Sequence, residues 1–191
     1  MVFRLSAKDI AGDGSAANGG DSVTGWADLS GNNYDAYVDQ GAPEFEADGM
    51  NANGGVNFDG SRSMTMADTT AINGTDFTQK SFAFSFETGN SVSGHQVIYE
   101  QGAHIHGLNL YVHNGSLYVS GYNQQASENS WQGSWISTII ASNTWYQATL
   151  VLRNGTDIVG EGSLELWLNG QLASTKPAAK LYGHTGHIGI G

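Results

Sequence analysis

Alternating apolar and polar positions dominate the chain after residue 80, and they predict β-strands. In SFAFSFE (81–87), phenylalanine occupies every second position, so the three rings would share one face of a strand. Similar patterns predict strands over residues 95–101, 134–140, 145–153 and 184–191. No long stretch has the 3.6-residue period of a helix, and residues 65–79 leave room for a single helical turn.

Two Asn-Gly pairs predict β-hairpins. Asn114-Gly115 lies between the alternating runs of residues 108–122, and Asn169-Gly170 lies between those of residues 163–175. Asn-Gly is the preferred pair for a two-residue type I′ turn. The first 60 residues are richer in loops, and short strands are expected there at 2–5, 35–38 and 56–58. Many short strands separated by turn signals predict an all-β fold, either a two-sheet antiparallel β-sandwich or a barrel.

Composition and charge narrow the classes of partner. The 191 residues carry 18 acidic and 7 basic side chains, for a net charge of −11. Such an excess of negative charge argues against nucleic acid and against anionic membrane surfaces as partners. There is no cysteine, which excludes disulfides and thiolate metal sites. No apolar stretch approaches the roughly 18 residues of a membrane span, so no membrane insertion is expected.

The segment DIAGDGSAANGGD (9–21) combines aspartates with glycines in a pattern that suits a cation. Calcium takes oxygen ligands from carboxylates and carbonyls, and glycines let the backbone curl around the ion. We predict a Ca²⁺ ion held by Asp9, Asp13 and Asp21, with Asp28 from the next polar segment, WADLSGNNYDA (26–36), completing its shell. The spacing is not that of an EF-hand. The alternative for both segments is a solvated turn held by side-chain hydrogen bonds.

The sequence offers no convincing catalytic pair. Glu161 and Glu165 lie four residues apart on one predicted strand, which is roughly 13 Å. That separation exceeds the ~6.5–9.5 Å between the carboxylates of an inverting glycosidase. His104 and His106 could share a strand face, but no carboxylate is placed to orient them for a metal. We therefore expect no catalytic residues and no enzymatic activity.

A polar and aromatic segment, residues 122–135, predicts a ligand contact. Sugar-binding sites combine aromatic rings with amide groups, and Tyr122, Asn123 and Trp131 are the candidates here. Trp135 stands at the start of a predicted strand and is expected to pack against neighbouring residues. Trp145 and Trp167 lie inside predicted strands and are expected in the core.

Three segments near the N-terminus carry a family resemblance: LSAKDIAGDGS (5–15), WADLSGNNYDA (26–36) and VNFDG (56–60). They resemble the laminin-G-like jelly-roll modules of the concanavalin A-like lectin/glucanase superfamily. Later segments that resemble successive strands of such modules are 82–89, 96–102, 107–123, 144–152 and 164–172. The resemblance implies two curved antiparallel sheets packed face to face, calcium in the acidic loop, and residence in large secreted bacterial adhesins.

The end of the chain bears on its domain organisation. The sequence stops at Gly191 within a strand pattern, whereas modules of this family continue into a further outer strand. We therefore expect a single domain over residues 1–191 that is excised from a larger chain, is interrupted after Gly191 and lacks its closing C-terminal strand.

Two functions remain open at this point. One is a non-catalytic, calcium-stabilised scaffold of a secreted bacterial adhesin, found extracellularly or on the bacterial cell surface, whose partners are the neighbouring domains of the adhesin chain. The other is a lectin-like module that binds a carbohydrate or a peptide. The family hosts both kinds of module, so its fold alone does not decide between them.

Overall fold

The computed structural model describes residues 2–49, 54–102, 105–123 and 133–191. The chain divides into two compact units, and each is described by itself. The N-terminal unit comprises residues 1–72 and 187–191, and the central unit comprises residues 73–186. Strands make up nearly all the regular structure of the described residues. No helix in these ranges is long and apolar enough to span a bilayer. The single domain over 1–191 stays a prediction.

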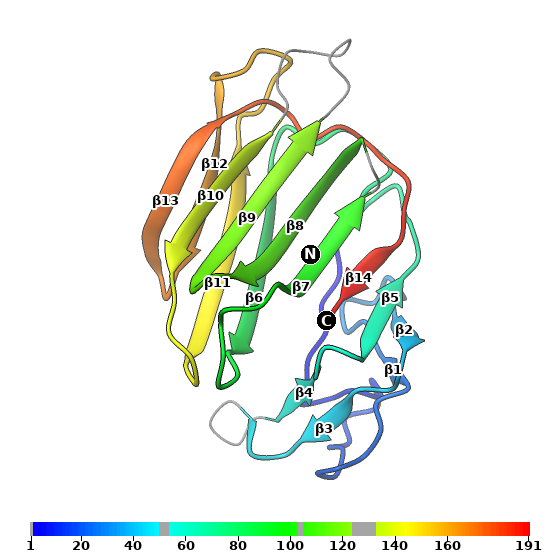
Figure 1. Ribbon diagram of the computed structural model, residues 1–191. Coiled ribbons are helices and arrows are strands. Elements are labelled where there is room, and N and C mark those ends of the chain that lie inside the picture. Colours follow the sequence, from blue (N-terminus) through cyan, green and yellow to red (C-terminus); the bar gives the residue numbers. More distant parts are fainter. Residues whose placement is uncertain (1, 50–53, 103–104, 124–132) are drawn as a thin grey trace. The chain divides into compact units, whose positions relative to one another are not determined.

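The central unit is a two-sheet antiparallel β-sandwich. Its first sheet has the order β13-β12-β11-β6, from strands β6 (Lys80–Glu87), β11 (Trp145–Arg153), β12 (Gly162–Leu168) and β13 (Gln171–Ala178). Its second sheet has the order β7-β8-β9-β10, from β7 (Gln96–Gly102), β8 (His106–His113), β9 (Ser116–Asn123) and β10 (Ser134–Ile139). The second sheet lies in front of the first in Figure 1. The predicted all-β sandwich is therefore confirmed.

Alternation along the strands builds the core between these two sheets. Phe82, Phe84 and Phe86 share one face of β6, as their spacing predicts. The ring of Tyr99 from β7 lies 5.2 Å from that of Phe82 and 5.1 Å from that of Phe84, centroid to centroid. These contacts join the two sheets. The buried aliphatic side chains around them include Leu108, Leu110, Val112, Leu117, Val119, Ile136, Leu150, Leu152, Leu164 and Leu166.

Both predicted Asn-Gly hairpins are confirmed. Asn114 and Gly115, between β8 and β9, have φ angles of 47° and 75°. Asn169 and Gly170, between β12 and β13, have φ angles of 51° and 79°. A type I′ turn requires a positive φ at both central residues, which asparagine and glycine tolerate best. These turns set the register of the paired strands, and so decide which side chains share a face.

The N-terminal unit contains shorter strands. β1 (Gly25–Trp26) pairs with β2 (Ala36–Gln40), β2 with β5 (Ser63–Met66), and β5 with β14 (Ile188–Ile190). A separate pair joins β3 (Glu44–Glu46) to β4 (Gly55–Asn57). The buried side chains of Met64, Met66 and Ile188 form part of the core of this unit.

One expectation for this unit was wrong. Residues 2–5 form no strand, because their backbone instead serves the turn that follows β1. The Arg4 amide donates to Asp28 Oδ1 and the Arg4 carbonyl accepts from Leu29 N. Thr65 and Met66 belong to β5, where they pair with Gly189 and Ile188. Residues 65–79, which leave room for one helical turn, contain a hydrogen-bonded turn in which the Ile72 amide donates to the Thr69 carbonyl.

Candidate functional site

The side of the β7–β10 sheet that faces away from the β6–β13 sheet carries a continuous set of aromatic and polar side chains. We call it the outer face. The strands alternate between the core and this face, since Leu110 and Val112 of β8 are buried while Tyr111 between them is not. The register of the four strands assigns to the outer face Val97, Glu100, Asn109, Tyr111, His113, Ser116, Tyr118, Ser120, Tyr122, Trp135, Ser137 and Ile139.

Aromatic rings form the centre of the outer face. The rings of Tyr111 and Tyr118 lie opposite each other on β8 and β9, stacked with centroids 5.1 Å apart and an interplanar angle of 7°. His95 extends this group, with its ring centroid 4.8 Å from that of Tyr111. Trp135 on β10 is a diagonal neighbour of Tyr118 and is 44% exposed. The face therefore presents a nearly flat aromatic surface beside an exposed indole.

A polar row crosses the sheet next to these rings. The register places Glu100, Asn109, Ser120 and Trp135 side by side on four successive strands. The Ser120 hydroxyl donates to Asn109 Oδ1 at 2.5 Å, which fixes the orientation of the amide. Glu100 is exposed at the end of this row. Hydrogen-bonding groups and aromatic rings are thus interleaved on one surface.

Tyr122 continues the outer face towards the end of β9. Its ring lies across Gly107 of β8, where a Cβ atom would collide with the tyrosine hydroxyl. Burial raises the pKa of Tyr122 above its ordinary value, and the negative charge of Glu100 raises that pKa further. The hydroxyl therefore keeps its proton at neutral pH and can donate a hydrogen bond. The pKa of Tyr111 is also raised, mainly by burial and to a smaller extent by the nearby Tyr118.

The predicted ligand residues lie in different places. Tyr122 is on the outer face, whereas Asn123, the next residue of β9, points into the interior and is 1% exposed. Successive residues of a strand face opposite sides, which is why the structure does not bring these two together. Trp131 lies outside the described residues.

Three tryptophans depart from the expected packing. Trp135 was expected to pack, but Ile136 fills the interior position and leaves the indole on the outer face. Trp145 and Trp167 were expected in the core, but both are half-buried. Trp167 lies between buried Leu166 and the end of β12, and its Nε1 donates to Glu165 Oε2 at 2.8 Å. Whether each indole points inwards or outwards depends on which alternate positions of its strand face the core, and the sequence did not reveal this here.

The four candidate calcium ligands occupy separate local environments. Asp13 Oδ1 accepts hydrogen bonds from the amide and the hydroxyl of Ser15, and these bonds lower the pKa of Asp13. Asp21 Oδ2 accepts from the backbone and side-chain nitrogens of Asn18. Asp9 Oδ1 is buried and makes no hydrogen bond. Across residues 2–49, 54–102, 105–123 and 133–191, no three acidic or histidine side chains cluster as metal ligands.

Asp28 organises the turn after β1. Its two carboxylate oxygens accept from the amides of Arg4, Ser30 and Tyr34 and from the hydroxyl of Ser30. Burial alone would raise the pKa of Asp28, but these hydrogen bonds together lower it. The carboxylate thus ties the N-terminal segment to the loop over residues 28–34. Its role as a calcium ligand stays a prediction, as do those of Asp9, Asp13 and Asp21.

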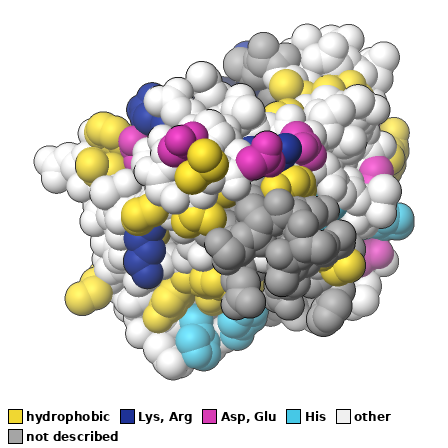
Figure 2. All heavy atoms as spheres, turned by 90° about the horizontal axis from the view of Figure 1, so that it is seen from above, with side chains coloured by type: hydrophobic (Ala, Val, Ile, Leu, Met, Phe, Trp, Pro, Cys, Tyr) yellow, Lys and Arg dark blue, Asp and Glu magenta, His cyan; other side chains and the backbone are white. Residues whose placement is uncertain are grey.

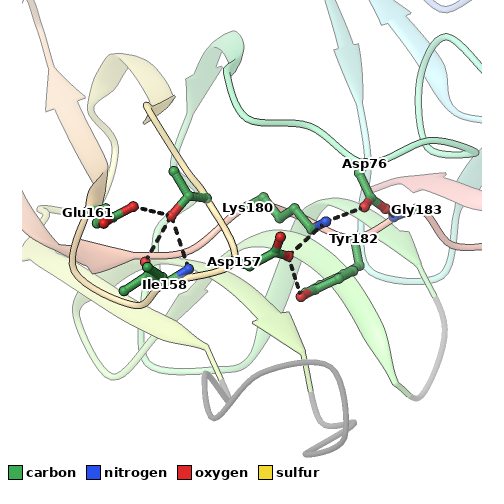
Figure 3. Close-up of polar contacts among 8 residues, drawn as sticks. Asp76, Asp157, Ile158, Glu161, Lys180, Tyr182 and Gly183 are labelled. Atoms are coloured by element: carbon green, nitrogen blue, oxygen red, sulfur yellow. Dashed lines mark hydrogen bonds and ion pairs between the residues drawn. The ribbon is translucent and has the colours of Figure 1, made fainter.

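A compact charged group, here called the Lys180 cluster, lies elsewhere in the central unit (Figure 3). Lys180 Nζ lies 2.8 Å from Asp76 Oδ2 and 2.9 Å from Asp157 Oδ1. The Tyr182 hydroxyl donates to Asp157, and the Gly183 amide donates to Asp76. Hydrogen bonds to both carboxylates raise the pKa of Lys180. Figure 2 shows acidic side chains (magenta) and basic side chains (dark blue) next to each other on one face of the molecule.

The other candidate catalytic groups have separate partners. Glu165 accepts from Arg153 Nε as well as from Trp167, whereas Glu161 accepts from the Thr156 hydroxyl. His106 Nδ1 lies 3.2 Å from the Gly183 carbonyl oxygen, and its ring stacks on Tyr182. His104 lies outside the described residues. Each of these described groups takes part in a local structural contact.

Comparison with known proteins gives matches at the level of structure only. No protein-family model matches the chain, and no curated protein matches it. The receptor-binding domain of the botulinum neurotoxin C/D mosaic serotype matches all of this chain, with a TM-score of 0.65 and 14% identity. The binding domain of Paraclostridial Mosquitocidal Protein 1 matches 98% of it, with a TM-score of 0.63 and 16% identity.

A third match is a botulinum neurotoxin type C structure, for a toxin whose uptake into cells depends on interaction with two ganglioside molecules. It covers 99% of this chain, with a TM-score of 0.63 and 14% identity. The chain spans only 42–44% of the length of these three structures. At identities this low the likeness shows the fold alone, a β-sandwich of the kind present in toxin binding domains.

Proposed function

We propose that this chain is a non-catalytic, lectin-like module that binds carbohydrate on the outer face of the β7–β10 sheet. The observation that carries the proposal is the stacked pair of Tyr111 and Tyr118 beside the exposed indole of Trp135. A sugar ring has one face of C–H groups, which packs on an aromatic ring, and a rim of hydroxyls, which needs hydrogen-bonding groups. The outer face provides both within one set of adjacent strands.

The arrangement also accounts for why these rings are not in the core. Leaving large aromatic side chains in water forgoes roughly 1.5–3 kcal/mol of burial for each ring. A surface that keeps half-buried tyrosine rings around an exposed indole, next to ordered polar groups, is typical of an interaction site. Glu100 and Asn109 provide oxygen and amide groups at the edge of the rings, and the hydroxyl of the buried Ser120 orients Asn109.

Two lines of comparison agree with this function. Two of the matching structures are described as a binding or receptor-binding domain, and the third belongs to a toxin whose cell entry depends on gangliosides. The segments over 5–15, 26–36 and 56–60 resemble the laminin-G-like modules of a superfamily that includes lectins. Neither line identifies a sugar, so the proposal rests on the geometry of the outer face.

The test is a glycan array followed by titration of the strongest binder. Trp135→Ala is expected to weaken binding at least tenfold without unfolding the protein, because the indole is exposed. Trp167→Ala is the matched control, since it removes a half-buried tryptophan from the opposite sheet. Absence of binding to every glycan on the array, or equal losses in the two variants, would contradict the proposal.

We further propose that calcium stabilises the N-terminal unit, as in an extracellular scaffold of a secreted bacterial adhesin that presents neighbouring domains. The observation in favour is Asp9, whose Oδ1 atom is buried and has no hydrogen-bond partner. A buried carboxylate oxygen without a partner is costly, and a bound cation would remove that cost. Asp13 and Asp21 lie in the same glycine-rich segment and would be the next ligands.

Thermal melts in EGTA and in millimolar calcium test this second proposal. Calcium at about 100 times its Kd would add about 2.7 kcal/mol to the free energy of unfolding. Asp9→Asn is expected to remove most of that gain. Asp39→Asn is the control, because Asp39 is an exposed acid that contacts Ser63 in the same unit. A midpoint that does not respond to calcium would leave the acidic segment as a hydrogen-bonded turn.

A further inference from the structure

We propose that the glycan bound by the outer face is neutral, and that the face discriminates against glycans that carry a carboxylate or a sulfate. The inference rests on the proposed carbohydrate-binding function and names the substrate class of that same site. It follows from the distribution of charge around the β7–β10 sheet.

The stretch of chain that builds the outer face contains no permanent positive charge. Residues 81–152 include neither lysine nor arginine, and β7–β10 lie entirely within this stretch. Recognition of an anionic group in proteins relies above all on arginine and lysine, which pair with carboxylate, phosphate or sulfate oxygens. The outer face has no such residue to offer an anionic sugar.

The basic side chains of the central unit come from segments other than β7–β10. Arg153 Nε pairs with Glu165 on the other sheet, 2.9 Å away. Lys180 is held between two carboxylates in the Lys180 cluster. Lys80 on β6 lies over the Phe77 ring, with Nζ 3.8 Å from its centroid. Lys176 belongs to β13, also in the other sheet. None of these four residues lies on a strand of the outer face.

Among the described residues of β7–β10, the one acidic side chain on the outer face adds a repulsive element. Glu100 is exposed and stands in the polar row directly opposite Asn109. Its field reaches Tyr122, where it contributes to the raised pKa of the hydroxyl. A ligand carboxylate placed over the same row would meet this negative charge at short range. Like-charge juxtaposition is a common means of rejecting the wrong partner.

The same groups suit a neutral sugar. A carboxylate accepts hydrogen bonds from hydroxyls, and such charge-assisted bonds are stronger than bonds between neutral groups. Asn109 is held in place by the hydrogen bond from the buried Ser120 hydroxyl, so its amide group keeps one orientation beside Glu100. A hydroxyl-rich rim is therefore satisfied without any cation, while the sugar ring packs on Tyr111 and Tyr118.

A neutral glycan differs from the gangliosides with which the matching botulinum neurotoxin type C interacts. A ganglioside carries sialic acid and is therefore anionic, whereas the outer face favours an uncharged glycan. The shared fold allows such a difference, because the ligand is chosen by side chains on the sheet and by the charge around them.

The experiment uses pairs of oligosaccharides that differ only in one acidic group. A neutral galactose-terminated oligosaccharide is compared with its sialylated form, and other neutral oligosaccharides with their sulfated forms, at pH 8 and low salt. The proteins are the full chain, Glu100→Gln, Glu100→Lys and, as a control, Glu87→Gln. Glu87 is exposed at the end of β6 in the other sheet.

We expect the neutral member of each binding pair to bind at least tenfold more tightly than its acidic counterpart. Glu100→Gln should narrow that ratio, Glu100→Lys should reverse it for at least one pair, and Glu87→Gln should leave it unchanged. Equal or tighter binding of the acidic members would overturn the inference while leaving carbohydrate binding intact. Failure of every neutral and acidic probe to bind would overturn both the inference and the proposed function.

Discussion

The Lys180 cluster and the outer face are two polar regions of the central unit with opposite designs. In the Lys180 cluster, one ammonium group lies within 3 Å of two carboxylates, and a tyrosine hydroxyl and a backbone amide add further hydrogen bonds. Its two carboxylates share one ammonium group as their partner. The outer face instead presents stacked rings, an exposed indole and a carboxylate on a flat surface of four strands. Polar groups that bind each other hold loops in place, whereas those displayed on a sheet are available to a ligand.

The largest expected effect concerns the outer face. Tyr118→Ala should weaken binding of the strongest glycan by about 10–100-fold, because it removes the platform on which the sugar packs. The same change should lower the free energy of unfolding by only about 1 kcal/mol, the worth of a stacked aromatic pair. Calorimetric titration and urea unfolding give the two quantities.

Two further variants sharpen this test. Tyr118→Phe keeps the ring and should retain most of the affinity. Tyr37→Ala removes an exposed tyrosine from β2 and should leave binding unchanged. If Tyr118→Ala lowers stability but not affinity, the outer face is a structural surface and the comparison with the Lys180 cluster fails.

The Lys180 cluster should show the reverse behaviour with a smaller effect. Lys180→Met leaves Asp76 and Asp157 near each other without a cation, and should lower the free energy of unfolding by about 1 kcal/mol. Glycan affinity should not change. Lys176→Met, on the exposed strand β13, is the control and should alter stability by less than about 0.5 kcal/mol. A loss of affinity in Lys180→Met would show that the two regions are not separate in function.

Local patterns predicted the elements that place the outer face, but not which residues it displays. The spacing of Phe82, Phe84 and Phe86 and the two Asn-Gly turns identified the strands and their hairpins correctly. Trp135 and Asn123 were misjudged because polar and apolar residues mix on both faces of β9 and β10. Ser120 on the outer side and Asn123 on the inner side are both buried. Which alternate residues face the core then depends on how the strand is paired with its neighbours, and the sequence of one strand does not reveal that pairing.

The Lys180 cluster could not have been found from spacing. Asp76, Asp157 and Lys180 lie in three segments that are far apart in the sequence, and only the folded sandwich brings them together (Figure 3). Asp28 illustrates the complementary difficulty, because an aspartate among glycine, serine and asparagine suggests a metal ligand and a capped turn equally well. The structure adds the four donors that the carboxylate accepts.

The smallest expected effect is the pH dependence of the Lys180 cluster, which tests its electrostatic origin. Burial would raise the pKa of Asp76, but hydrogen bonds from Lys180 and Gly183 lower it below its ordinary value of 3.8. A carboxyl group with a lowered folded pKa stabilises the fold above its unfolded pKa, and that contribution is lost as the pH falls through the folded value. Because the pKa of Lys180 is raised, its contribution to the stability of the fold is fully present below pH 10.5, its ordinary pKa.

The stability difference between the parent chain and Lys180→Met should therefore be constant from pH 5 to 9 and shrink below about pH 4. Urea unfolding of both proteins at pH 7, 5, 4 and 3 measures it, and a difference that persists at pH 3 would mean that Lys180 acts through the contact of its ammonium group with the Tyr182 ring rather than through the two carboxylates.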